Sequence, residues 1–233
     1  MSKVLIAGGG HAGANTAFAL RKDGFDGDIT IISYEDYLPY HRPPLSKDFL
    51  KQSIGIEKLS FKPANFYEEQ NISINLNTRI DAINLESNHV KATDVTFDFD
   101  YLVFATGASP RLLQMENADA ANLFYLRQIT DALSVQKAIG SAKDIVLIGG
   151  GYIGLEVASV MTELGLNVVI LEAEDRILQR VTSPEVSNFY NDFHSKKGVE
   201  IICNARVTSL EAKNKIINTV NLESGKSISA DIV

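Results

Sequence analysis

Cysteine is nearly absent from the sequence, since Cys203 is the one thiol among 233 residues. A single cysteine can form neither an internal disulfide nor a two-thiol redox centre. Its apolar surroundings (VEIICNARV) predict a buried position in a strand. We therefore expect the protein to work in a reducing compartment.

Long apolar segments are also missing. No run of about 18 apolar residues occurs, so the sequence predicts no membrane-spanning helix. The opening stretch, MSKVLIAGGG, has an apolar run too short for the core of a signal peptide. These observations favour a soluble, cytoplasmic protein.

The sequence has no excess of positive charge, because it contains 22 Lys and Arg residues and 29 Asp and Glu residues, which gives a net charge of -7. Nucleic-acid binding needs clustered Lys and Arg to neutralise phosphates, and here the basic residues are scattered. No spacing of His, Cys, Asp and Glu suggests a metal site, and His89 and His194 look like surface positions. The composition, with 45% hydrophobic and 22% charged residues, is that of an ordinary globular protein.

One pattern is present twice. Residues 4–7 form a short apolar run that leads into glycines, a helix-compatible stretch over 11–21 and a second apolar run over 29–32, which together predict a strand-helix-strand unit. The same order returns between residues 144 and 171. The sequence therefore predicts an α/β fold.

The length predicts two domains. Pro110 and the polar stretch to Asn122 predict a linker, which puts the first domain in residues 1–110 and the second in residues 111–233. Between the repeats, residues 72–104 alternate apolar and polar side chains, which predicts a small meander ending in a buried strand. A late helix is expected to begin at Thr182 or Ser183, with a capping box between Thr182 and Glu185. One face of this helix carries Val186, Phe189, Tyr190 and Phe193.

Glycines follow the first strand of each repeat in the spacing G-x-G-x-x-G. The first glycine permits a tight turn, the second lets the backbone approach a pyrophosphate, and the third lets the helix pack on the strand. The helix N-terminus adds unpaired N–H groups and a positive dipole. Two such turns in the right context predict two Rossmann-like dinucleotide-binding domains. The glycines are Gly8, Gly10 and Gly13 in the first repeat and Gly149, Gly151 and Gly154 in the second.

A carboxylate follows the second strand of each repeat, Glu35 in the first and Glu172 in the second. In such folds this carboxylate binds ribose hydroxyls, although both residues could also be solvated charges at a strand end. At Glu172 it favours NAD over NADP, because it repels a 2′-phosphate. Arg176 and Arg180 lie close enough in the sequence to keep NADP open.

The motifs PYHRPPLSK, DYLVFATGASPR, GGGYIGLEVAS and RILQRVTSPEVSNFY give the sequence a specific resemblance. It resembles the two-dinucleotide flavoprotein reductases, in particular the ferredoxin and rubredoxin reductases of the putidaredoxin-reductase type that serve oxygenases. The resemblance covers the whole chain. It implies an FAD domain with an inserted NAD domain, in which the first glycine turn holds FAD and the second holds NADH, whose hydride passes to the flavin.

The resemblance also implies roles for single residues. Lys47 would sit at the flavin ring, where a cation favours hydride acceptance, and Glu156 would pair with it. Tyr152 would cover the flavin and move aside for nicotinamide, or else pack against the turn. His11 and His41 would line the site, because hydride transfer needs no proton relay. The resemblance implies further cofactor contacts in addition to the glycines, Glu35 and Glu172. These are Ala12, Arg42, Ala105, Thr106, Gly107 and Ile153.

Redox thiols are missing from the places where related disulfide reductases carry them. The resemblance then implies that electrons leave the flavin directly, to a ferredoxin or rubredoxin, a quinone-like molecule or oxygen. Two alternatives stay open, a monodehydroascorbate-type reductase and a flavoprotein that binds NADH as a signal. Relatives continue past SISADIV with a second FAD segment, so we expect the FAD domain here to be incomplete.

Overall fold

The computed structural model describes all 233 residues, and the chain divides into two compact units. The first unit contains Met1–His41 and Ile56–Ser109, and the second contains Arg42–Gly55 and Pro110–Val233. The sequence predicted a change of domain near residue 110, where the units do change, but residues 42–55 pack with the second unit. Which nucleotide each unit binds stays a prediction.

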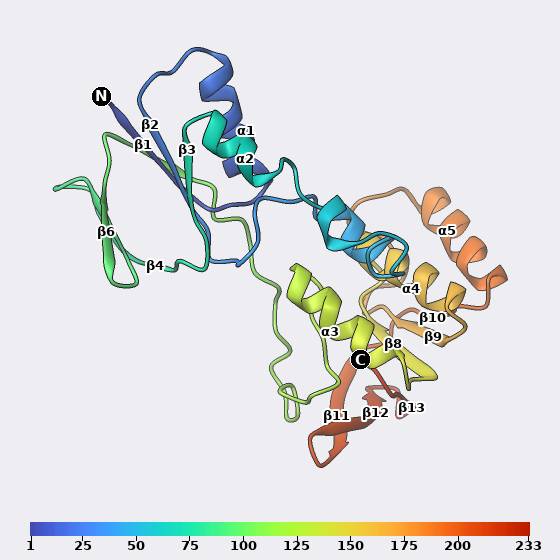
Figure 1. Cartoon of the computed structure of the whole chain (residues 1–233). Coiled ribbons are helices and arrows are strands. Elements are labelled where there is room, and N and C mark those ends of the chain that lie inside the picture. The colour runs from blue at the N-terminus through green and yellow to red at the C-terminus, as the bar shows by residue number, and fades with distance from the viewer. The chain divides into compact units, whose positions relative to one another are not determined.

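A parallel sheet of four strands, in the order β3-β2-β1-β7, forms the centre of the first unit. Figure 1 shows α1 and α2 on one side of this sheet and the small antiparallel sheet β4-β5-β6 on the other. The elements are β1 Lys3–Ala7, α1 His11–Lys22, β2 Asp28–Ile32, the 3-10 turn η2 Ile56–Lys58, α2 Ala64–Glu69, β3 Ile72–Asn75, β4 Ile80–Asn84, β5 His89–Ala92, β6 Val95–Asp98 and β7 Tyr101–Phe104.

The central strands of the first unit, β1 and β2, are buried on both faces, as parallel strands usually are. Because successive side chains point to opposite faces, Ile6 packs with the helices whereas Leu5 packs with the antiparallel sheet. The predicted meander is present as β4 to β6, but β7 is not a fully buried strand, since Tyr101 and Phe104 are exposed.

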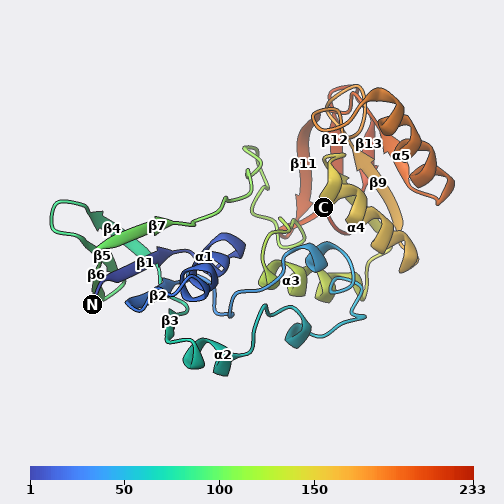
Figure 2. The ribbon, with the colours of Figure 1, turned by 90° about the horizontal axis from the view of Figure 1, so that it is seen from above.

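The second unit repeats this plan with a parallel sheet β10-β9-β8 and an antiparallel sheet β11-β12-β13. Figure 2 shows the three antiparallel strands side by side. Ile145 packs with the helices, and Val146 packs with the antiparallel sheet. The elements are the 3-10 turn η1 Pro43–Ser46, α3 Ile129–Ile139, β8 Asp144–Ile148, α4 Tyr152–Glu163, β9 Asn167–Leu171, α5 Pro184–Lys196, β10 Glu200–Ile202, β11 Val207–Lys213, β12 Ile216–Leu222 and β13 Ser227–Ser229.

Three sequence predictions in the second unit were wrong. Pro184 is the first residue of α5, which makes Ser183 the N-cap and leaves no capping box at Thr182. His194 is 6% exposed and lies in the interior, where burial lowers its pKa. Cys203 follows β10 and is half-buried, and burial raises the pKa of its thiol.

No helix in the 233 residues has the length and apolar character needed to cross a membrane.

Candidate functional site

The first glycine turn connects β1 to α1 and fits the sterics expected of a nucleotide-binding turn. Gly8 has a φ of +123°, which side-chain-bearing residues rarely adopt, and a Cβ there would lie 2.1 Å from the Ala105 carbonyl oxygen. A Cβ on Gly13 would lie 1.9 Å from the Gly8 carbonyl oxygen. Gly10 is the N-cap of α1, and no side chain caps the helix. The first N–H groups of α1 therefore have no side-chain acceptor and can bind an anion.

The second glycine turn, between β8 and α4, repeats this geometry. Gly149 has a φ of +116°, and a Cβ on Gly154 would lie 2.2 Å from the Gly149 carbonyl oxygen. Gly151 is the N-cap of α4, again without a side-chain cap. A Cβ on Gly151 would meet no atom within 4 Å, so there is open space above the turn. Tyr152 and Ile153 begin α4 beside this space, and both are about half exposed.

Glu172 follows β9 with its carboxylate fixed by the backbone. The Gly150 N–H donates to Glu172 Oε2 at 2.7 Å, and the Glu174 N–H donates to Oε1 at 2.9 Å. This ties the acid to the second glycine turn. A pocket of about 300 Å³ beside it is lined by Gly151, Glu172, Glu174, Leu178, Gln179 and Arg180.

Both arginines near Glu172 are already engaged. The Arg176 guanidinium donates to Ser187 Oγ at 2.6 Å and to the Gln179 carbonyl oxygen at 3.1 Å. Arg180 forms an ion pair with Glu174 at 3.2 Å.

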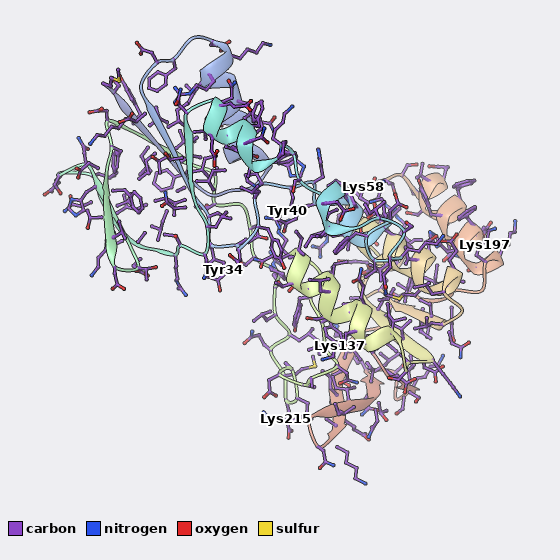
Figure 3. The ribbon with its side chains drawn as sticks, in the orientation of Figure 1. Tyr34, Tyr40, Lys58, Lys137, Lys197 and Lys215 are labelled. Atoms are coloured by element: carbon purple, nitrogen blue, oxygen red, sulfur yellow. The ribbon has the colours of Figure 1, made fainter.

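Glu35, the corresponding acid of the first unit, accepts a hydrogen bond of 2.5 Å from the Tyr40 hydroxyl. Tyr40 is buried, so the bond holds the carboxylate near the end of β2. A cavity of about 330 Å³ also adjoins the first turn, and Tyr34, labelled with Tyr40 in Figure 3, lies on its wall. The lining is Ala7, Gly8, Ile32, Tyr34, Thr78, Arg79, Ile80 and Thr106.

His11, the first residue of α1, belongs to an aromatic cluster. Its ring centroid lies 4.7 Å from that of Phe61 and 5.8 Å from that of His41, and the His41 and Phe61 centroids are 4.3 Å apart. Both histidines predicted as lining residues thus come together in the first unit.

Lys47 and Glu156 lie in the second unit and form an ion pair of 2.7 Å between Nζ and Oε2. Glu156 is on α4, after the second glycine turn, and Lys47 follows η1. The sequence predicted this pairing from the resemblance. Arg42 also lies in the second unit, where its guanidinium donates to the Arg127 carbonyl oxygen at 2.9 Å.

An apolar pocket of about 590 Å³ in the second unit begins at the second glycine turn. Its wall includes Gly149, Gly151 to Gly154 and the last strand residues of β8. Leu50, Phe124, Leu126 and Val233 complete its apolar side. Its position, at the carboxyl end of a parallel strand, is where open α/β sheets bind ligands.

Residues 2–233 match the family described as pyridine nucleotide-disulphide oxidoreductase. The chain belongs to this family. The α/β fold with two Rossmann-like units that the sequence predicted is thereby confirmed.

Relatives of this chain include the rubredoxin-NAD(+) reductase of Pseudomonas putida, which is 39% identical over 231 residues. That alignment covers 99% of this chain and 60% of the relative. Putidaredoxin reductase CamA of Pseudomonas putida is 36% identical over 236 residues, with 99% of this chain and 56% of the relative covered. The chain thus spans about 60% or less of the length of these relatives.

Solved structures of similar reductases agree with these sequence comparisons. A covalent putidaredoxin reductase-putidaredoxin complex contains a chain with a TM-score of 0.96 and 36% identity, over 100% of this chain and 57% of that one. The ferredoxin reductase of the CYP199A2 system from Rhodopseudomonas palustris has a TM-score of 0.97 and 35% identity, over 100% of this chain and 58% of that one.

Several residues of the candidate sites were not predicted from the sequence. Phe61 and Tyr40 contact predicted site residues, and Ser46 donates to Glu156 Oε2 at 2.5 Å. Ser46 stands directly before Lys47 in PPLSK, but no spacing rule pointed to its hydroxyl. The cofactor contacts predicted for each residue remain predictions.

Proposed function

We propose that the protein is an FAD-dependent reductase that takes hydride from NADH and passes electrons to a ferredoxin- or rubredoxin-type protein, as a component of an oxygenase system. The observation that carries this proposal is the uncapped glycine turn present in both units, each followed by a carboxylate anchored after the second strand. The relatives named as rubredoxin and putidaredoxin reductases support it.

The first turn is assigned to FAD and the second to NADH. The two glycine turns have the close packing of dinucleotide-binding turns, because the third glycine of each turn contacts the first and leaves no room for a Cβ. Above Gly151 the space is open, which suits a pyrophosphate at the uncapped start of α4.

The contacts around Glu172 favour NADH over NADPH. Its carboxylate is oriented by two backbone N–H groups, so it would accept hydrogen bonds from ribose hydroxyls and repel a 2′-phosphate. Arg176 is held by Ser187, and Arg180 is paired with Glu174. The Glu174 carboxylate offsets the charge of Arg180, which weakens the attraction that this guanidinium could offer a 2′-phosphate.

Lys47 supplies the positive charge of the proposed reaction. A bound FAD would supply the hydride acceptor and the one-electron redox chemistry that the proposed reaction needs. The ammonium of Lys47 would stabilise negative charge that develops on the flavin, and Glu156 holds that ammonium at 2.7 Å. Tyr152, half exposed at the start of α4, would stand beside the nicotinamide.

The proposed acceptor is an iron-sulfur or rubredoxin-type protein. Cys203, the one cysteine of these 233 residues, follows β10 and belongs to neither glycine turn. A cytoplasmic location is proposed with it, because a reductase of this kind needs a supply of NADH.

The test is an anaerobic titration of the FAD-loaded protein with NADH, followed by oxidised rubredoxin or [2Fe-2S] ferredoxin, with absorption spectra recorded at each step. We expect NADH to bleach the flavin band and the iron protein to restore it. An FAD-loaded protein whose flavin NADH does not reduce would refute the proposal. Reoxidation by ascorbate radical alone, or a long-lived charge-transfer band with every acceptor, would refute the assigned acceptor.

A further inference from the structure

Ser46 is a buried hydroxyl that the proposed function does not use. It is the last residue of η1, and it is 5% exposed. Its Oγ lies 2.5 Å from Glu156 Oε2 and 3.4 Å from the Pro43 carbonyl oxygen. A hydroxyl has one proton to donate, and the short bond to a carboxylate is much the stronger of the two.

The oxygen that accepts the Ser46 proton also binds Lys47. Glu156 Oε2 lies 2.7 Å from Lys47 Nζ, so consecutive residues of one turn donate to the same atom of α4. The Lys47 ammonium makes a second bond, of 3.2 Å, to the Pro43 carbonyl oxygen. An ammonium has three N–H donors, which leaves one to face a ligand.

The ion pair alone would not hold the ammonium in one place. The side chains of Lys47 and Glu156 are 45% and 31% exposed, and ion pairs at such sites gain little because two long, flexible side chains must be ordered. Ser46 differs from both because its side chain is short and buried. It is the rigid member of the group.

We propose that Ser46 is a positioning residue that fixes the Glu156 carboxylate and thereby the Lys47 ammonium. This inference rests on the proposed function, in which Lys47 acts on the flavin. Without the Ser46 hydroxyl, Glu156 could turn on α4, and Lys47 would spread over several positions. The charge would then stabilise the reduced flavin less well.

The main test replaces the hydroxyl in Ser46→Ala and measures two properties of the FAD-loaded protein. We expect the rate of flavin reduction at saturating NADH to fall roughly tenfold, with little change in the NADH concentration at half-saturation, because misplacement of a positioned group costs rate. The flavin midpoint potential should fall by about 30 mV, which is a tenfold change for a two-electron couple.

A third measurement needs no flavin. In the protein labelled with ¹⁵N-lysine, an ordered ammonium exchanges its protons slowly, and Lys47→Met identifies its signal. Ser46→Ala should broaden or remove this signal. Ser46→Thr, which keeps the hydroxyl, should restore part of the signal, the rate and the potential. Should Ser46→Ala fold poorly, Ser46→Cys has nearly the same size with a weak donor, and we expect it to behave as Ser46→Ala.

Ser53→Ala is the matched control, because Ser53 lies in the same segment and its exposed hydroxyl donates only to the Asp48 carbonyl oxygen, at 3.0 Å. If Ser46→Ala or Ser46→Cys matches Ser53→Ala in all three measurements while Lys47→Met lowers the rate and potential, Ser46 has no positioning role. If Lys47→Met changes neither rate nor potential, the proposed role of Lys47 is wrong, and the inference fails with it.

Discussion

Replacing Gly151 by alanine should separate the stability of the second unit from its nucleotide binding. Gly151 has a φ of -81° and a ψ of -179°, which any residue adopts, and an added Cβ would meet nothing within 4 Å. Gly→Ala at a compatible site stabilises a protein by about 0.4–1 kcal/mol through the unfolded chain, and the poorer N-cap offsets part of this. We expect Tm to change by less than about 4 °C.

The same substitution should strongly weaken the binding of NADH. The space above Gly151 is where the backbone would approach the pyrophosphate, so the new methyl group would push the phosphates away from the N–H groups of α4. Losing one hydrogen bond to a charged group costs about 1.5–3 kcal/mol. The Kd of NADH should therefore rise by roughly 10- to 100-fold.

Two further glycines provide the comparison. Gly154→Ala should lower Tm, because its Cβ would lie 2.2 Å from the Gly149 carbonyl oxygen. Gly140→Ala, at the end of α3, should leave both properties unchanged, because its nearest neighbour is the Lys137 carbonyl oxygen at 3.9 Å. Thermal melting and calorimetric titration with NADH measure the two properties. Wild-type NADH affinity in Gly151→Ala would refute the placement of the pyrophosphate, and a large loss of Tm would refute the steric argument.

Three other predictions concern the second unit. Glu172→Gln keeps an acceptor for the Gly150 N–H but loses the negative charge. The ratio of NADH to NADPH affinity should therefore fall by roughly tenfold in parallel binding titrations. An unchanged ratio would contradict the role of the carboxylate. Burial lowers the pKa of His194, so below about pH 6.5 the unfolded chain binds a proton that the folded chain does not. Stability should then be lost as the pH falls from about 7 to about 5.5, and the Tm of His194→Gln should depend less on pH in this range. Equal slopes of Tm against pH in the wild type and the variant would exclude His194 as the cause. Asn122 is buried and makes three hydrogen bonds of 2.8 Å, to both backbone groups of Ile217 and to the Asp231 carbonyl oxygen. Asn122→Ala should therefore lower the free energy of unfolding, measured with urea, by about 3 kcal/mol. A loss below about 1 kcal/mol would refute this prediction.

The features that the sequence predicted well are local. The glycine turns follow from residues close together in the chain, because a positive φ at Gly8 and Gly149 and a tight contact at Gly13 and Gly154 are met by glycine alone. The alternation of apolar runs and helical stretches likewise predicted the strands and helices that flank these turns.

The orientation of α5 shows why other features could not be predicted. Its apolar side chains suggested an inward face, yet Phe189 and Phe193 are exposed, whereas Ser187 and His194 are buried. Ser187 and His194 lie two turns apart, hence on one face, and the Ser187 hydroxyl bonds both Arg176 and the Ile177 carbonyl oxygen. Polar contacts with the loop that precedes α5 therefore decide which face turns inward, and the helix's own periodicity does not encode them.

The segment 42–55 shows the same limit at the candidate site. The predicted domain boundary at residue 110 put this segment in the first domain, but its side chains bond the second unit: Lys47 pairs with Glu156, as the resemblance implied, and Lys51 pairs with Glu163 at 2.9 Å. Both partners belong to α4, which also begins at the second glycine turn. From Gly151 to Glu156 the helix rises only about 7.5 Å. One rigid helix thus carries both the N–H groups proposed for the NADH pyrophosphate and the carboxylate that holds Lys47, so a change in α4 should alter nucleotide binding and the proposed flavin cation together.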